Sequence, residues 1–164
     1  MELSAFNTLS AEAAADVVRP CADVGDWVAA VVAGRPYDEL DDLLALADSE
    51  ARAWTPAEVD GALAHHPRIG ERLAGVGAEQ DLSRSEQATI AGRDGDVDAA
   101  IAAGNAAYEE RFGRVFLIRA AGRSAPEILQ HLTTRLEHDD VAELGIVADE
   151  LRQIALLRLE GTFA

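Results

Sequence analysis

The chain has 164 residues, of which 49% are hydrophobic, and its formal net charge at pH 7 is -16. This length and hydrophobic content fit one buried core, so we expect a single compact domain over residues 1–164. The negative charge repels nucleic-acid phosphates and anionic lipids, and no apolar run approaches the ~18 residues of a membrane span, so we expect a soluble cytoplasmic protein that binds neither nucleic acid nor membrane.

Apolar residues recur at helical spacing and period-2 alternation is nearly absent, which predicts an all-α fold, a bundle of about seven or eight helices. Three helix starts carry capping residues: Ser10 before AEAAADVV, Thr55 in TPAE and Ser124 in SAPE. Further helices are predicted in GDWVAAVVAG, in DELDDLLALADSEARAW, from about Asp96 to Phe112 before Gly113, and from about Asp139 to Leu159.

Two segments have no clear helical period. VFLIRA, at positions 115–120, is short and β-branched enough to be extended, and it is equally compatible with a buried link or a helical turn. RIGERLAGVGAEQDLSRS, at positions 68–85, holds three glycines, which predicts a loop after the helix that begins near Thr55. Loops on rigid helical scaffolds often carry function.

The types of residue restrict the chemistry. All fourteen basic residues are arginine, so no lysine is present to hold pyridoxal phosphate or to form a Schiff base with a substrate. Cys21 is the only cysteine, which excludes an internal disulfide and a thiolate metal cluster, and we expect a buried thiol. His131 and His138 lack the pattern of a zinc site, so we expect structural or surface roles, and neither a metal nor an organic cofactor.

His66 lies three residues after Leu63 and seven after Val59, so it continues the inward stripe of the helix that begins near Thr55. Because Pro67 disfavours helical backbone in the residue before it, the helix is predicted to end at His65. A histidine there is either an acid or base working near neutral pH, or a structural residue that interacts with the last helical carbonyls.

Glu86 follows Ser83 by three residues, which is the capping-box pattern of a helix start. This pattern favours a structural role for Glu86. The same position follows a glycine-rich loop at a helix N-terminus, which suits ligand groups, and the two roles are compatible.

Arg158 is placed on the core face of the last helix, because the inward stripe runs through Leu144, Val147, Leu151 and Ile154 to Arg158. A buried guanidinium is costly unless it is paired. Arg158 therefore extends past the helix end to solvent, pairs with a buried carboxylate, or meets an anionic ligand.

These residues fall within motifs that together resemble the 2-oxo-4-hydroxy-4-carboxy-5-ureidoimidazoline (OHCU) decarboxylase family. The motifs are HPRIG at 66–70, SxxEQ at 83–87, NxxYxxxFGxxF at 105–116 and ExxxIxxLRL at 150–159, preceded by a similar segment at 27–37. The resemblance covers nearly the whole chain. It implies an all-helical, homodimeric enzyme that converts its small-molecule substrate to (S)-allantoin in urate degradation, without metal or organic cofactor.

The resemblance also implies roles for particular residues. The catalytic histidine, glutamate and arginine of the family fall on His66, Glu86 and Arg158. Positions that line or shape the family's pocket fall on Pro67, Ser83, Gln87 and Phe112. Relatives often have an aromatic residue and a proline where this chain has Arg114 and Val115.

Other functions fit the same residues. One is a non-catalytic helical module that binds a ligand or a partner protein, and another is a lyase or hydrolase acting on a different ureido compound. The presence of His66, Glu86 and Arg158 together favours the decarboxylase, since a non-catalytic scaffold has no need of all three.

Overall fold

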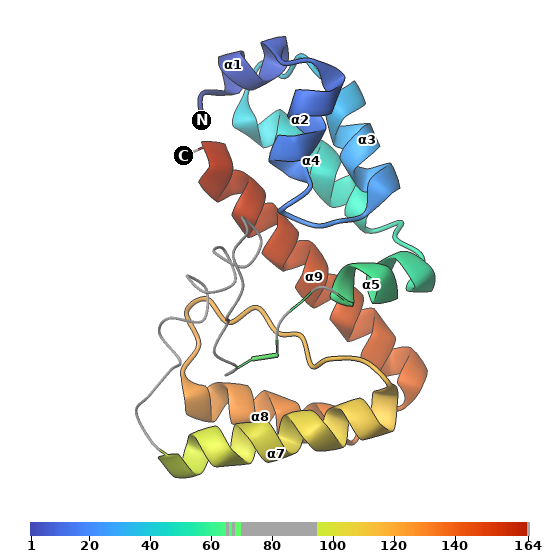
Figure 1. The fold of residues 1–164 in the computed structure, drawn as a ribbon, viewed down its shortest axis with the longest axis vertical. Coiled ribbons are helices and arrows are strands. Elements are labelled where there is room, and N and C mark those ends of the chain that lie inside the picture. Colours follow the sequence, from blue (N-terminus) through green and yellow to red (C-terminus); the bar gives the residue numbers. More distant parts are fainter. Residues whose placement is uncertain (65, 67, 70–94, 164) are drawn as a thin grey trace. The chain divides into compact units, whose positions relative to one another are not determined.

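A computed structural model describes residues 1–64, 66, 68–69 and 95–163 (Figure 1). In this part of the chain there are eight helices and no strand, which confirms the predicted all-α fold. The helices are α1 (Leu3–Thr8), α2 (Ala11–Val18), α3 (Gly25–Ala33), α4 (Leu40–Ala51), α5 (Pro56–Leu63), α7 (Gly95–Phe112), α8 (Ala125–Arg135) and α9 (Asp140–Phe163). None of the described helices has the length and hydropathy that crossing a membrane requires.

The predicted helix starts are confirmed by their capping contacts. The Ser10 Oγ accepts a hydrogen bond from the backbone N–H of Ala13 at 3.2 Å, at the start of α2. In α5 the Thr55 N–H donates to Glu58 at 2.7 Å, and α8 has the reciprocal capping box between Ser124 and Glu127. Each contact satisfies backbone donors that the first helical turn leaves unpaired.

The helix ends agree less closely with the prediction. The end of α7 is an exception: it stops at Phe112 as predicted, where Gly113 takes a φ of 67°, a left-handed conformation that ends a helix. α5 stops at Leu63, before the predicted His65, because the His66 N–H bonds back to the Leu63 carbonyl at 2.9 Å in a tighter turn. α9 runs beyond Leu159 to Phe163.

Contacts between residues far apart in the sequence explain the elements that hydrophobic periodicity did not predict. α1 is only six residues long, and its Phe6 ring is fully buried and meets Phe163 edge to face at a centroid distance of 5.1 Å. The same contact supports the last turn of α9. Of the conformations that fitted VFLIRA, the structure shows a buried link, since residues 115–120 form neither helix nor strand and Phe116, Leu117 and Ile118 are buried.

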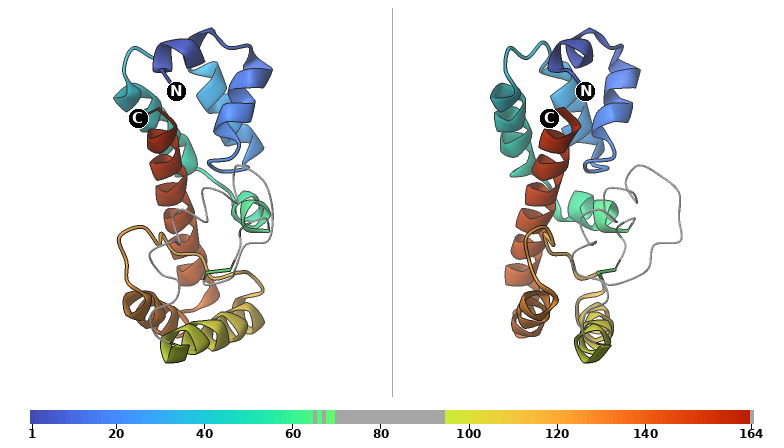
Figure 2. Two further views of the ribbon diagram at one scale, coloured as in Figure 1. Left: turned by 60° about the vertical axis from the view of Figure 1, so that its left-hand side comes forward. Right: turned by 90° about the vertical axis from the view of Figure 1, so that its left-hand side faces the viewer.

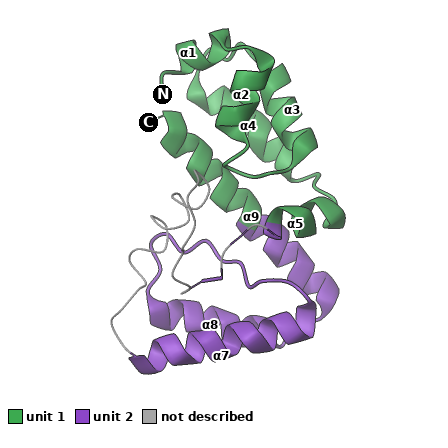
Figure 3. Ribbon diagram, in the orientation of Figure 1, with its two compact units in different colours: residues 1–62, 151–164 green, residues 63–150 purple. Residues whose placement is uncertain are grey.

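Residue contacts divide the chain into two compact units (Figure 3). Unit 1 is Met1–Ala62 with Leu151–Ala164, and unit 2 is Leu63–Glu150. Helix α9 supplies residues to both. The expectation of a single domain stays a prediction.

Unit 1 is built around Trp27 of α3, which is 1% exposed and donates its indole N–H to the Ala47 carbonyl of α4 at 2.9 Å. Trp54 meets the same ring edge to face at 5.9 Å. The last turns of α9 lie beside α1 and α4 (Figure 2). Cys21 is buried in this unit, as predicted.

Unit 2 is built around α7 and α8, which lie side by side in both further views (Figure 2). Gly104 permits this close approach, because a β-carbon there would come within 2.5 Å of a methyl group of Leu132 on α8. The core between them, called here the α7–α8 core, contains Ile69, Ile101, Tyr108, Phe112, Phe116, Ile118, Ala120, Ile128 and Leu132.

Candidate functional site

His66 is 8% exposed and follows the inward stripe of α5 into unit 2. Val59 and Leu63 of that stripe are also buried, so the predicted inward position of His66 is confirmed. Its backbone N–H is held by the Leu63 carbonyl. An imidazole in this position is largely shielded from solvent, which strengthens its electrostatic interactions with any bound group.

The residues after His66 are attached to α7. Asn105 donates its side-chain N–H to the Ile69 carbonyl at 3.0 Å. One turn further along α7, Glu109 accepts two hydrogen bonds from the Arg68 guanidinium, from Nε at 2.5 Å and from Nη2 at 2.8 Å. Ile69 itself is buried in the α7–α8 core.

Phe112 ends α7 and is 9% exposed, with its ring tilted against Tyr108 at a centroid distance of 4.7 Å. The Arg111 guanidinium lies 5.1 Å from the centroid of the same ring. Phe112 belongs to the α7–α8 core together with Ile69, and His66 lies in the same unit.

Arg158 is 3% exposed, and Val147, Leu151 and Ile154 of its predicted stripe are buried as well. The inward position of this arginine is therefore confirmed, and its burial is contrary to the alternative in which the side chain reaches solvent. Its Nη1 donates to the Pro20 carbonyl at 3.3 Å, within unit 1.

The other predicted site residues, Pro67, Ser83, Glu86 and Gln87, lie outside the described residues, as does most of the predicted loop at 68–85. The structure thus describes His66 and Phe112 in unit 2 and Arg158 in unit 1. Convergence of His66, Glu86 and Arg158 on one pocket stays a prediction.

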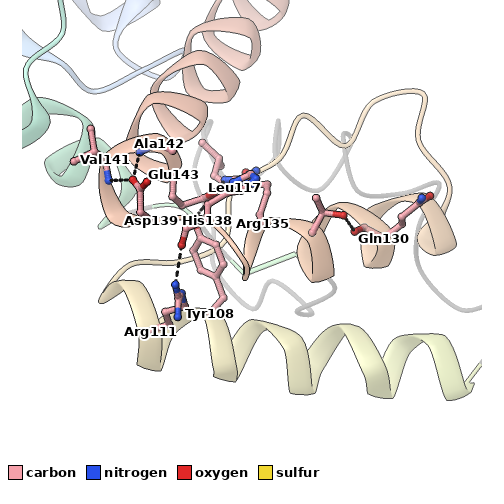
Figure 4. A network of polar contacts seen from close by, with 11 residues as sticks. Tyr108, Arg111, Leu117, Gln130, Arg135, His138, Asp139, Val141, Ala142 and Glu143 are labelled. Carbon is pink, nitrogen blue, oxygen red and sulfur yellow. Dashed lines mark hydrogen bonds and ion pairs between the residues drawn. The ribbon is translucent and has the colours of Figure 1, made fainter.

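A buried polar network that the sequence pattern did not reveal lies where α7, α8 and the start of α9 meet (Figure 4). Glu143 is fully buried and accepts a hydrogen bond from the Tyr108 hydroxyl. Arg135 approaches the same carboxylate oxygen, Oε1, with Nε at 2.7 Å and Nη2 at 2.6 Å. His138 Nδ1 lies 3.0 Å from the second oxygen, Oε2.

The chemistry of this network is that of a structural ion pair. Arg135 also donates to the Leu117 carbonyl at 2.6 Å and lies 4.6 Å above the Phe116 ring. Burial raises the pKa of the Tyr108 hydroxyl, and its hydrogen bond to Glu143 raises that pKa further, so Tyr108 stays a proton donor. Because the Glu143 carboxylate is enclosed by these partners, the network serves to join three helices.

One sequence signal indicates two buried polar residues that the sequence analysis did not single out, Asn105 and Arg135. Asn105 stands on the buried stripe of α7 between Ile101 and Tyr108, and Arg135 continues the stripe of Ile128 and Leu132. A polar residue at an apolar position of a helix is the same signal that indicated the burial of Arg158.

Within the described ranges, no group of three or more histidine, cysteine, aspartate or glutamate side chains is arranged to hold a metal ion. His131 is exposed, and its Nε2 lies 2.6 Å from a guanidinium nitrogen of Arg123. His138 is engaged with Glu143.

In the described residues the fold is all-helical, with a histidine buried just after α5 and an arginine buried on the inner face of α9, and comparisons with known proteins define the family. The family model for OHCU decarboxylase matches residues 7–160. A 2-oxo-4-hydroxy-4-carboxy-5-ureidoimidazoline decarboxylase from Amia calva is 34% identical over 98% of this chain and 93% of its own length. This chain belongs to the OHCU decarboxylase family.

A further relative and two solved structures are also similar to this chain. The uric acid degradation bifunctional protein TTL from Arabidopsis thaliana is 34% identical over 63% of this chain, a match that spans 33% of that protein. A crystal structure of OHCU decarboxylase in the presence of (S)-allantoin superposes with a TM-score of 0.77 at 25% identity, over 90% of this chain and 97% of that chain. A crystal structure of (S)-allantoin synthase shares the fold, with a TM-score of 0.71 at 14% identity over 99% of this chain and 54% of that one.

Proposed function

We propose that this chain decarboxylates OHCU to (S)-allantoin in urate degradation. The observation that carries the proposal is the similarity, over nearly the full length of both chains, to a solved OHCU decarboxylase whose structure was determined with (S)-allantoin. The Amia calva relative, similar over 98% of this chain, supports the same activity.

The substrate explains how the reaction proceeds without lysine. OHCU has a ring C=N bond beside the carbon that bears the carboxylate. When the C–C bond to the carboxylate breaks, carbon dioxide leaves and the electron pair enters this C=N bond, so the substrate is its own electron acceptor. The product of this step is an enol: its hydroxyl group loses a proton and becomes the ring carbonyl, and a proton adds to the neighbouring carbon that bears the ureido group. Delivery of that proton from one face gives the (S) product. We propose that neither a metal nor an organic cofactor takes part.

Three residues carry the proposed chemistry. His66 assists loss of the carboxylate near the 4-hydroxyl group and takes part in proton transfer. Arg158 holds an anionic or carbonyl group of the substrate through the planar fork of its guanidinium. Glu86, together with Gln87, binds N–H groups of the ureido chain or the ring.

Neighbouring residues complete the proposed pocket. Pro67, Ser83 and Phe112 shape or line its wall. Positioning of the substrate and electrostatic stabilisation of the developing charge account for the rate.

We further propose a cytoplasmic homodimer with no nucleic-acid or membrane partner. The resemblance to the family supports the dimer, the net charge of -16 opposes binding to nucleic acid and anionic lipid, and a single cysteine suits a reducing compartment. Light scattering during size-exclusion chromatography tests the dimer, and a monomeric mass at assay concentration contradicts it.

The activity is tested by generating OHCU in place from urate with the two upstream enzymes and following the product by circular dichroism. The proposed function predicts faster formation of allantoin with an excess of the (S) enantiomer. Spontaneous decay yields racemic product, so a racemic product formed at the uncatalysed rate contradicts the proposal and favours a non-catalytic binding module or action on another ureido compound.

A further inference from the structure

The short segment after His66 is held by two side chains that lie one turn apart on α7, Asn105 and Glu109. Residues four apart in a helix face the same way, so both side chains reach the same stretch of chain. Asn105 binds the backbone at Ile69, and Glu109 binds the side chain of Arg68.

The Asn105 contact is the buried one. Asn105 is 5% exposed, and its Nδ2 donates to the Ile69 carbonyl at 3.0 Å. Its Oδ1 is buried, and within the described part of the chain no donor reaches it. An amide with one unsatisfied atom among apolar side chains costs free energy that an apolar residue would avoid. What Asn105 adds in return is a directional bond that fixes the backbone at Ile69.

The Glu109 contact is the exposed one. Its two oxygens meet the Arg68 guanidinium in a forked arrangement, and the hydrogen bonds from Arg68 lower the pKa of the Glu109 carboxyl. The Arg68 side chain is 50% exposed and that of Glu109 27%, so solvent screens the pair and its free energy is modest. The fork nevertheless restricts where Arg68 lies.

We infer that Asn105 and Glu109 are positioning residues that set the place of His66. On one side of His66, its N–H is bonded to the end of α5 at Leu63. On the other side, Arg68 and Ile69 are bonded to α7. The histidine backbone therefore lies between two fixed points, and a misplacement of about 1 Å in a catalytic group is enough to cost up to 10²-fold in rate.

This inference rests on the proposed function, in which His66 acts on the substrate. Asn105→Leu is the main test, because leucine has the same branched arrangement of heavy atoms and suits the surrounding core while lacking the N–H donor. We expect kcat to fall about tenfold or more, with KM changed less and the thermal midpoint maintained.

Asn7→Leu is the matched control. Asn7 makes an amide clamp of the same kind in unit 1, donating to the Tyr37 carbonyl at 2.8 Å and accepting from the Tyr37 N–H at 3.0 Å. We expect this variant to lose stability and keep its kcat. If kcat falls equally in Asn7→Leu and Asn105→Leu, in proportion to lost stability, the inference is overturned.

Glu109→Gln tests the exposed contact, and Glu110→Gln on the exposed face of α7 changes the net charge equally. We expect kcat to fall about two- to threefold in Glu109→Gln, a loss comparable to that of a surface ion pair, and to stay unchanged in Glu110→Gln. Equal kcat in the two variants argues against a positioning role for Glu109.

A second measurement separates this inference from the proposed function, since it needs no turnover. The imidazole signals of His66 are assigned in NMR spectra by their absence from His66→Ala. We expect Asn105→Leu to shift or broaden them and to leave the signals of His138 in place. Unchanged His66 signals overturn the positioning role, whereas an unmodified chain that does not act on OHCU overturns the proposed function alone.

Discussion

His66 and His65 are neighbours in sequence, and the proposed function gives them different roles. We expect His66→Ala to lower the rate of (S)-allantoin formation by about 10²-fold or more, the scale of a lost general acid or base. His65→Ala is the control, and we expect its rate to stay within about twofold of the unmodified chain. Circular dichroism of the allantoin formed measures both. Equal losses in the two variants count against His66 as the catalytic residue.

Arg158 is buried and charged. Two substitutions there show whether activity requires only a positive charge or also the planar shape of the guanidinium. Lysine keeps the charge but has no planar fork, and we expect Arg158→Lys to lose at least about tenfold in kcat/KM. Arg158→Met keeps the apolar stem, and we expect it to be inactive yet folded, because the charge it removes is costly to bury.

Thermal unfolding and decarboxylation are to be measured on both Arg158 variants. A marked loss of thermal stability in Arg158→Met, combined with near-normal activity in Arg158→Lys, identifies Arg158 as a structural residue. The proposed contact with the substrate is then wrong.

For single residues, the sequence predicts whether a side chain is buried better than it predicts which residue that side chain binds. Arg158 and His66 are buried as their helical spacing indicated, because the spacing decides which face of a helix points inward. The acceptor of Arg158 at Pro20 and the pairing of Tyr108 with Glu143 join residues far apart in the chain. Such pairings depend on how helices pack, which no local pattern contains.

The packing of α7 on α8 depends on a glycine. In Gly104→Ala the new methyl group meets Leu132, a fully buried residue, so overpacking of about 1–3 kcal/mol outweighs the gain of up to about 1 kcal/mol in helix propensity. Gly145→Ala in α9 is the control, because a β-carbon added at Gly145 would meet no atom within 4 Å. Urea unfolding should show the first variant destabilised and the second stabilised. Equal stabilisation of both contradicts close packing at Gly104.

Asp48 links α4 to α9 within unit 1, through ion pairs with Arg52 of the turn after α4 and Arg152 of α9. Burial raises the pKa of Asp48, but the hydrogen bonds and charges of the two arginines outweigh that effect and hold the pKa below 3.8. The folded chain thus binds this proton more weakly than the unfolded chain. The resulting stability is present above about pH 3.8 and is lost as the pH falls through the lower folded pKa.

We therefore expect Asp48→Asn to lower the free energy of unfolding by about 1 kcal/mol near neutral pH, the scale of a partly exposed ion pair. The difference between variant and parent should vanish once the pH lies well below 3.8. Urea titrations at several pH values measure it. A difference that is independent of pH means that the carboxylate charge is not responsible.

Helix starts were predicted more accurately than helix ends. Capping residues such as Ser10 and Ser124 act on the backbone a few residues away, so the sequence alone contains the whole interaction. The last turn of α9 depends on Phe163 meeting Phe6 at the opposite end of the chain. The short α1 depends on the same pair, which explains why its six residues gave no detectable period.

At the scale of the whole molecule, the net charge of -16 affects the rate at which substrate reaches the protein. OHCU bears a carboxylate, so the overall field repels it. Raising the ionic strength from about 0.01 M to 0.15 M shortens the screening length from about 30 Å to about 8 Å. We expect kcat/KM to rise roughly two- to fivefold over this range. A fall in kcat/KM means instead that the local field of the arginines governs the encounter.

Unit 1 is discontinuous in sequence, since Leu63–Glu150 separates its two parts. On the ribosome, therefore, Phe6 is made well before its partner Phe163, because the whole of Leu63–Glu150 is made between them. At typical synthesis rates that delay is on the order of 10 s, and during it the apolar surfaces of α1 to α4 lack the end of α9. The helices α1 to α4 thus leave the ribosome before the segment that completes their core, and during that interval their apolar surfaces are exposed to chaperones and to aggregation.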